Sequence, residues 1–149
     1  DRLNEIKSFG RIFFTVGNME YLKHGGRIGK VASVAGSLLG IKPIITLKEG
    51  EIFPSGIGRS RRKTVDKTID LLLAYLAEEK VDIADYSICI GYGYDKEEAV
   101  EFRDRLVSRL KEKGYDIDTI PIFQIGATIG VHTGPYPLGI GVVKKSIRE

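Results

Sequence analysis

The sequence predicts a two-layer α/β domain with a mixed, partly antiparallel sheet and helices packed mainly on one face. Short runs rich in β-branched and aromatic residues alternate with longer segments of helical period. Residues 43–47 and 51–53 flank Lys48-Glu49-Gly50, a pattern typical of a β-hairpin. The 149 residues contain no repeat, low-complexity tract or linker, so we expect a single domain over residues 1–149.

The first part of the chain is divided by glycines. Residues 11–16 are β-branched and aromatic and are expected to form a strand. Residues 18–23 are expected to form a short helix that ends at Gly25-Gly26, because glycine readily adopts the left-handed C-cap conformation. Small and apolar residues at helical spacing predict a further helix over residues 30–39, which stops at Gly40.

Longer helices follow the hairpin. Residues 62–79 place their apolar side chains on one helical face. A second helix is expected from Asp95, a good N-cap residue, to Gly114. Pro121 indicates an edge position or an irregularity in the strand that contains it, and the glycine-rich segment 126–135 connects that strand to the last one. The strands expected in this half of the chain are residues 86–90, 117–125 and 138–143.

Composition is typical of a globular protein and excludes several classes. The formal net charge of +3 is too small to indicate nucleic-acid binding. The single cysteine, Cys89, lies in an apolar run and is expected to be buried. A chain with one cysteine cannot form an internal disulfide, and this favours a cytoplasmic location. No apolar run approaches the ~20 residues of a membrane span. Residues 1–7 resemble the tail of a helix and the first methionine is Met19, so we expect one domain of a longer protein.

Two nucleotide-binding motifs are nearly matched and then fail. In "HGGRIGKV", His24 stands where a phosphate loop needs its first glycine, and Val31 stands where it needs a hydroxyl. Lys30 is therefore expected only to start a helix. In "GYGYDK", Lys96 replaces the third glycine of a dinucleotide fingerprint, so a strand-to-helix turn is the better interpretation.

Metal and catalytic constellations are not evident. The two histidines are far apart in the sequence and there is one cysteine, so no zinc-ligand spacing occurs. No nucleophile elbow of the Gly-x-Ser-x-Gly type is found. We therefore expect neither a catalytic residue nor a metal ligand.

Two glycine-flanked side chains remain as candidate binding residues. Arg27 lies between Gly26 and Gly29, and its planar, permanently charged fork suits a carboxylate or phosphate. The alternative is an arginine that donates to local carbonyls at a helix end. In "GVHTGP", His132 and Thr133 can donate hydrogen bonds to an anion. The alternative there is a turn histidine held by backbone groups.

A basic cluster lies at the start of the predicted helix 62–79. It comprises Arg59, Arg61, Arg62 and Lys63, and cations at a helix N-terminus oppose the helix dipole. A solvated loop and a contact with a phosphate or an acidic partner are both open interpretations.

Three stretches together resemble a known family. "MEYLKHGGRIGK", "GSLLGIKPIITLKEGEI" and "IGATIGVHTGPYPLGIG" occur in the order and spacing of the carboxy-terminal half of the DegV family of bacterial fatty-acid-binding proteins. The resemblance covers about Phe13 to Val143. It implies that an amino-terminal α/β domain and this domain enclose one fatty acid, with the carboxylate at the domain boundary and the acyl chain in an apolar tunnel.

The resemblance also implies a role and site residues. Family members are non-enzymatic carriers without a cofactor that present the carboxylate of a long-chain fatty acid to a fatty-acid kinase. By position, the ligand-binding residues fall on Gly26, Arg27, His132 and Thr133, and the basic segment expected to contact a partner falls on Arg59, Arg61 and Arg62. The hydroxyl residues that complete the carboxylate site belong to the amino-terminal domain.

Small residues of the predicted helix 30–39 offer room for an acyl chain, or alternatively allow tight packing against the sheet. They are Ala32, Ser33, Ala35, Gly36 and Ser37. Each buried methylene contributes roughly 0.8 kcal/mol, so the tail would supply most of the affinity.

Two further functions stay open. The first is a phosphotransfer or kinase-related domain that uses Arg27 and the basic cluster on a small phosphorylated or keto substrate, by analogy with the dihydroxyacetone kinases. The second is a dimerisation or scaffold module without a ligand.

Overall fold

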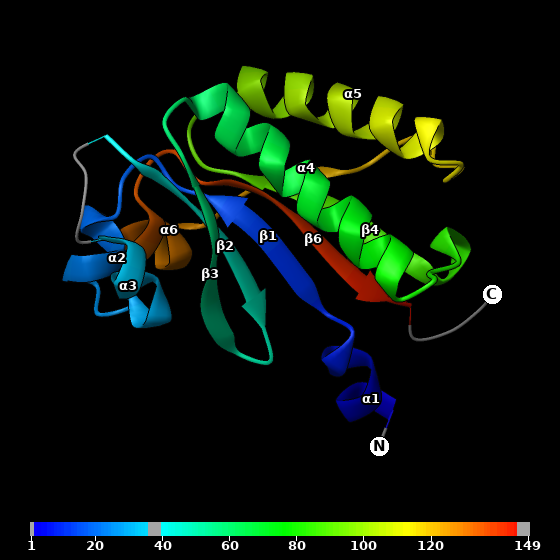
Figure 1. Ribbon diagram of the computed structural model, residues 1–149, viewed down its shortest axis with the longest axis horizontal. Coiled ribbons are helices and arrows are strands. Elements are labelled where there is room, and N and C mark those ends of the chain that lie inside the picture. Colours follow the sequence, from blue (N-terminus) through cyan, green and yellow to red (C-terminus); the bar gives the residue numbers. More distant parts are fainter. Residues whose placement is uncertain (1, 36–39, 146–149) are drawn as a thin grey trace.

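The computed structural model describes residues 2–35 and 40–145 and contains one six-stranded sheet (Figure 1). The strand order is β3-β2-β1-β6-β4-β5, and only the β4–β5 pair is parallel. The sheet is therefore mixed and mostly antiparallel, as predicted. Its strands are β1 (Arg11–Thr15), β2 (Lys42–Lys48), β3 (Glu51–Gly58), β4 (Tyr86–Tyr92), β5 (Ile122–Gln124) and β6 (Leu138–Lys144).

Two long helices, α4 (Arg61–Glu78) and α5 (Lys96–Glu112), lie side by side across one face of the sheet (Figure 1). Side-chain caps start both helices: Ser60 accepts from the Lys63 amide, and Asp95 accepts from the Glu98 amide. Between these helices and the sheet lies the main core. Its largest fully buried side chains include Ile69, Leu72, Leu76, Ile90, Phe102, Leu106, Leu110 and Ile140.

Short helices occupy the opposite face at one end of the sheet. These are α2 (Glu20–His24), the 3-10 turn η1 (Gly29–Val31), α3 (Ala32–Ala35) and α6 (Ala127–Thr133). They pack through a second, smaller core of Val16, Leu22, Val31 and Ile45. Figure 1 shows α2, α3 and α6 grouped together, whereas α1 (Arg2–Ser8) lies at the other end of β1. The remaining element is the 3-10 turn η2 (Ile83–Asp85).

Several predicted boundaries were wrong. The segment 126–135 was expected as a connection, but it contains α6; its glycines and β-branched residues have low helix propensity, and packing against α2 stabilises the helix instead. The predicted helix 30–39 is the η1 turn followed by α3, and residues 36–39 lie outside the described residues. The predicted strand 117–125 is shortened to β5, which is an edge strand as Pro121 indicated.

Side chains of the central strands alternate between a covered and an open face. On β6, Leu138, Ile140 and Val142 are buried beneath α4 and α5. Gly139, Gly141 and Val143 therefore point to the opposite face. Large apolar side chains of that face remain exposed: Ile12 by 42%, Val143 by 39% and Phe123 by 58%. Between the short helices and α1, the sheet presents an apolar surface that none of the described helices covers.

Candidate functional site

The "HGGR" stretch forms the C-terminal cap of α2. Gly26 has φ 65°, which only glycine adopts readily, and its amide donates to the Lys23 carbonyl at 3.1 Å. The Arg27 amide donates to the Leu22 carbonyl at 2.9 Å. These two bonds are those of a Schellman motif, so the predicted left-handed cap is confirmed at Gly26.

Arg27 leaves this cap on the protein surface. One of its guanidinium nitrogens, Nη1, donates to the Gly25 carbonyl at 3.1 Å. The local hydrogen bond that the sequence left open is therefore present. The other N–H groups of the guanidinium have no acceptor among the described residues, so most of the planar fork is free for a ligand.

The C-terminal ends of α2 and α6 interlock through two glycines and two rings. A Cβ atom at Gly25 would lie 2.2 Å from Nδ1 of His132. A Cβ atom at Gly134 would lie 2.5 Å from the ring of Tyr21. Each helix therefore ends in a glycine that receives a ring from the other helix. In this way two stretches a hundred residues apart, "HGGR" and "GVHTGP", become neighbours.

His132 lies in the last turn of α6. The alternative interpretation from the sequence, a histidine in a turn held by backbone groups, is therefore wrong. Its Nδ1 is buried and has no hydrogen-bond partner among the described residues. Because Nδ1 faces Gly25, Nε2 is the ring nitrogen available to a ligand. The next residue, Thr133, is buried and donates its hydroxyl to the Ile129 carbonyl at 3.2 Å.

A groove of about 760 Å³ runs past this junction. All four residues expected to bind a ligand line it: Gly26, Arg27, His132 and Thr133. Phe14, Leu22, Ile52 and Ile129 supply apolar parts of its wall. The structure thus brings the four expected residues together along one groove.

Lys30 also lines the groove. The prediction that Lys30 only starts a helix was therefore incomplete. Its ammonium group lies 2.6 Å from a carboxylate oxygen of Glu51 and 4.3 Å from the ring centroid of Phe53. The hydrogen bond and the charge of Lys30 lower the pKa of Glu51. The η1 turn thereby contributes a cation to the groove, paired with Glu51 of the hairpin, that the sequence pattern did not indicate.

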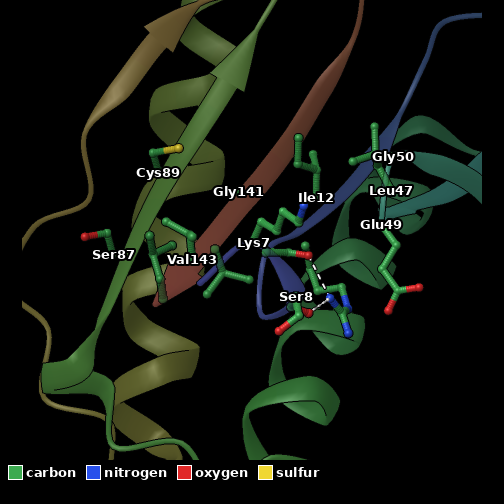
Figure 2. Close-up of a pocket in the computed structure, with 14 residues that line it drawn as sticks. Lys7, Ser8, Ile12, Leu47, Glu49, Gly50, Ser87, Cys89, Gly141 and Val143 are labelled. Atoms are coloured by element: carbon green, nitrogen blue, oxygen red, sulfur yellow. Dashed lines mark hydrogen bonds between the residues drawn. The ribbon is translucent and has the colours of Figure 1, made fainter. Parts of the chain in front are cut away.

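The groove continues into two apolar cavities along the open sheet face. A cavity of about 400 Å³ shares Phe14, Leu47, Ile129 and Thr133 with the groove. A third cavity, of about 840 Å³, shares Ile12, Leu47, Cys89 and Gly141 with the second (Figure 2). We call these two cavities the trough. It is predominantly apolar and extends from α6 towards α1 and β6.

Glycines and small side chains form the floor of the trough. Gly139 and Gly141 of β6 lie opposite Gly91 and Cys89 of β4. Cys89, expected to be buried, is half-buried and faces this floor. Burial raises the pKa of its thiol, so Cys89 stays protonated and acts as a small apolar side chain.

Of the small residues in the predicted helix 30–39 that were expected to leave room for an acyl chain, the structure describes the side chains of two. Ala32 and Ser33 are exposed and line none of these cavities. Gly36 and Ser37 lie outside the described residues, as does the side chain of Ala35. The signal for the trough was instead the alternation in "LGIGVV", residues 138–143, where two glycines fall on the same face of a strand.

Comparison with known proteins identifies the family. The family model described as an uncharacterised protein of the DegV family matches residues 1–145. The chain belongs to the DegV family. It is 36% identical to a DegV domain-containing protein of Clostridium perfringens, over 97% of this chain and 48% of that protein. The chain spans about half the length of the curated relatives it matches.

Solved DegV structures share the fold. The chain is 41% identical to a stearic-acid-binding protein of Eubacterium ventriosum, with a TM-score of 0.84 over 97% of this chain and 48% of that one. It is 28% identical to DegV of Bacillus subtilis, a fatty-acid-binding protein, with a TM-score of 0.69 over 96% of this chain and 48% of that one. The α/β fold predicted from the sequence patterns is confirmed.

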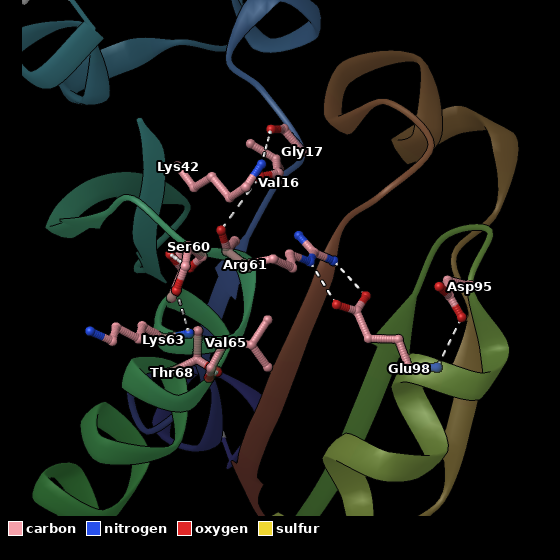
Figure 3. Close-up of polar contacts among 12 residues, drawn as sticks. Val16, Gly17, Lys42, Ser60, Arg61, Lys63, Val65, Thr68, Asp95 and Glu98 are labelled. Atoms are coloured by element: carbon pink, nitrogen blue, oxygen red, sulfur yellow. Dashed lines mark hydrogen bonds and ion pairs between the residues drawn. The ribbon is translucent and has the colours of Figure 1, made fainter. Parts of the chain in front are cut away.

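The basic cluster of this DegV-family chain lies apart from the groove. Arg61 donates through Nε and Nη2 to both carboxylate oxygens of Glu98, each at 2.8 Å, and so joins α4 to α5 (Figure 3). Its Nη1 is buried without a partner among the described residues. Arg59 and Arg62 are exposed. None of these arginines lines the groove or the trough.

The described part of this DegV-family chain contains neither a cluster of metal-ligating side chains nor a helix suited to a bilayer. Its histidine, cysteine and acidic residues do not gather in threes where a metal ion could be held. None of its helices combines the length and apolar character needed to cross a bilayer.

Proposed function

We propose that this chain binds one long-chain fatty acid and is the carboxy-terminal domain of a non-enzymatic, two-domain carrier. The observation that carries the proposal is the continuity between a groove lined by Arg27 and His132 and an apolar trough on the open sheet face. The stearic-acid-binding relative, 41% identical, supports the same ligand class. No cofactor is needed for this function.

The head group of the ligand belongs at the groove. A carboxylate there accepts hydrogen bonds from the free N–H groups of Arg27 and from Nε2 of His132 when that atom carries a proton. Lys30 adds a positive charge to the same groove. Glu51 offsets part of that charge, so the guanidinium is the principal anion-binding group.

The acyl chain belongs in the trough. Each methylene that leaves water there contributes roughly 0.8 kcal/mol, so a chain of many methylenes supplies most of the affinity. Ligand sites of this kind are apolar with a few polar groups at one end, which matches the groove and trough together.

An amino-terminal domain completes the site in this proposal. Exposed Ile12, Phe123 and Val143 form an apolar face of the type that a second domain covers. The chain spans about half of its relatives, which leaves room for such a domain. That domain would close the trough and contribute hydroxyl groups to the carboxylate.

The carrier role requires a partner enzyme. We propose that a cytoplasmic fatty-acid kinase phosphorylates the carboxylate that this protein presents. Exposed Arg59 and Arg62 are the basic side chains available for that contact, whereas Arg61 is held by Glu98.

Native mass spectrometry of the full-length protein purified from bacteria tests ligand binding. We expect a mass increment equal to one fatty acid, which organic extraction removes and added octadecanoic acid restores. Octadecanol of the same chain length is the matched control and should bind more weakly. A protein that stays empty when offered fatty acids of all chain lengths would overturn the proposal.

Kinase presentation needs a separate experiment. Acyl phosphate formation by a bacterial fatty-acid kinase should depend on this protein, and the double variant Arg59→Glu/Arg62→Glu should slow it without changing fatty-acid affinity. Equal rates for the variant and the unmodified protein would exclude the two arginines as contacts.

A further inference from the structure

We propose that Gly141 determines how far an acyl chain extends along the open sheet face, and therefore which chain lengths this protein prefers. This inference rests on the proposed fatty-acid binding and concerns the interior of the same site. The two cavities of the trough meet at a small set of residues. These are Ile12, Leu47, Cys89 and Gly141.

Gly141 lies at the centre of this junction. It pairs with Ile12 on β1 and with Cys89 on β4, and Figure 2 shows it between these two residues. Its neighbours Ile140 and Val142 are buried beneath α4 and α5. A side chain at position 141 would therefore point into the trough, where the two cavities join.

The fold requires glycine at position 139 but not at position 141. At Gly139, a Cβ atom would lie 2.4 Å from Cβ of Phe14 and 2.7 Å from the Phe13 carbonyl oxygen, so backbone would have to move. At Gly141, a Cβ atom would approach only the Cys89 Sγ, at 3.1 Å. That sulfur is the end of a side chain and can rotate away.

The backbone conformation at position 141 does not require glycine either. Gly141 is not among the residues with positive φ, so its strand conformation suits any residue. A glycine in the interior of a strand weakens the strand, and it often marks a place where a ligand approaches closely. Because neither packing nor backbone demands this glycine, the space above it is free for a ligand chain to pass.

A side chain at position 141 would close the passage between the two cavities. The groove and the adjoining cavity of about 400 Å³ would still hold the carboxylate and the proximal methylenes. Neither Arg27 nor His132 is among the residues at the junction. Methylenes beyond the junction would lose their burial. The loss is about fourfold in affinity for each of them, which corresponds to ~0.8 kcal/mol.

The test measures affinity against chain length in the full-length protein. Variants Gly141→Ala and Gly141→Val are compared with the unmodified protein for even-numbered saturated acids from octanoic to octadecanoic. Gly130→Ala is the matched control, because its added methyl meets nothing within 4 Å and Gly130 lines neither the groove nor the trough.

We expect the affinity of Gly141→Val to match that of the unmodified protein for short acids and to fall progressively below it beyond one threshold length. Gly141→Ala should show a smaller loss at the same threshold. A profile for both variants that parallels the unmodified protein at every length would overturn the inference while leaving fatty-acid binding intact. If the unmodified protein binds no fatty acid, the proposed function itself fails.

A second measurement is made on the unmodified protein. Cys89 lies at the junction, so a chain that crosses it should shield the thiol from N-ethylmaleimide. Modification of Cys89, located by peptide mass spectrometry with saturating acid, should slow at least tenfold once the acid reaches the threshold length found with Gly141→Val. Protection that is the same for octanoic and octadecanoic acids would contradict the proposed path.

Discussion

The imidazole of His132 occupies the space that any side chain at Gly25 would need. A Cβ atom there would lie 2.2 Å from Nδ1 and 3.0 Å from the adjacent ring carbon. The paired glycines of α2 therefore have different tasks: Gly26 adopts the left-handed conformation that ends the helix, and Gly25 leaves room for the histidine.

Gly25→Ala is expected to displace the His132 ring without unfolding the domain, because Gly25 has right-handed helical φ and ψ that alanine adopts easily. Loss of one hydrogen bond to a charged ligand corresponds to about a tenfold lower affinity for octadecanoic acid. Ring-proton NMR signals of His132 should shift, and isothermal titration calorimetry reports the affinity.

Gly130→Ala is the control for this variant and should change neither quantity. Unchanged His132 signals in Gly25→Ala would contradict the structural relationship. Shifted signals with unchanged affinity would show instead that His132 does not contact the ligand.

Arg27→Ala is expected to reduce selection for a carboxylate rather than affinity for the acyl chain. A hydrogen bond to a charged group contributes about 1.5–3 kcal/mol, so the preference for octadecanoic acid over octadecanol should fall roughly 10- to 100-fold. Arg27→Lys keeps the charge but loses the fork, and an intermediate ratio is expected. Competition binding with both ligands measures the ratio; a ratio unchanged in Arg27→Ala would remove Arg27 from the head-group site.

Tyr75 makes the stability of the domain sensitive to alkaline pH. Its hydroxyl donates to the Phe9 carbonyl at 2.8 Å, and burial, together with the neighbouring Tyr86, raises its pKa from 10.0 to about 12. The unfolded chain therefore loses this proton at lower pH than the folded protein. The stabilisation is fully present below pH 10 and is lost as the pH rises towards 12.

Tyr75→Phe is expected to lower the free energy of unfolding by about 1 kcal/mol at neutral pH, because the Phe9 carbonyl loses its donor. Above pH 10 the variant should lose stability less steeply than the unmodified protein. Urea unfolding at a series of pH values measures both effects. Tyr94→Phe, which removes a hydroxyl from a ring that is 77% exposed, should have no effect at neutral pH. Parallel curves for the Tyr75 variant and the unmodified protein above pH 10 would count against the assignment.

The Arg61–Glu98 pair is expected to stabilise the contact between α4 and α5. Both side chains are only 24% exposed, and two 2.8 Å hydrogen bonds join them. Arg61→Ala should lower the free energy of unfolding by about 1–3 kcal/mol, since a partly buried carboxylate is left without its partner. A double-mutant cycle with Glu98→Ala should give a coupling of about 1–2 kcal/mol.

Arg105 and Asp66 supply a more exposed comparison on the same two helices. They share one hydrogen bond, at 3.1 Å, with exposures of 31% and 37%. Their coupling should be smaller, about 0.2–1 kcal/mol. Equal couplings for the two pairs would show that the bidentate geometry contributes nothing further.

Local patterns predicted the elements whose signals lie within one segment. The apolar period of α4, the Asp95 cap of α5 and the β2–β3 hairpin are confirmed, because each depends on residues close in sequence. Pro54 lies within β3, yet that strand continues to Gly58 rather than stopping at residue 53. A proline is tolerated there because β3 is an edge strand, and only the strand order reveals an edge.

The features of the candidate site also fall into those that local motifs predicted and those that they did not. Arg27 and His132 were recognised from their glycine-flanked motifs, but α6, the role of Gly25 and the part played by Lys30 were not. Each of these depends on a partner far along the chain: α2 for α6, His132 for Gly25, and Glu51 for Lys30. No local period or spacing records such a contact.

By itself, the sequence determined the fold class, the order of the main helices and strands, the family resemblance and the residue types at the groove. These follow from local propensity, hydrophobic period and motif order, all of which can be determined from the sequence alone. Only the tertiary structure decided where the apolar trough lies. The pairing of β6 with β1 and β4 sets Gly139 and Gly141 among Ile12, Phe14 and Cys89, and the pairing places that floor on the face opposite α4 and α5.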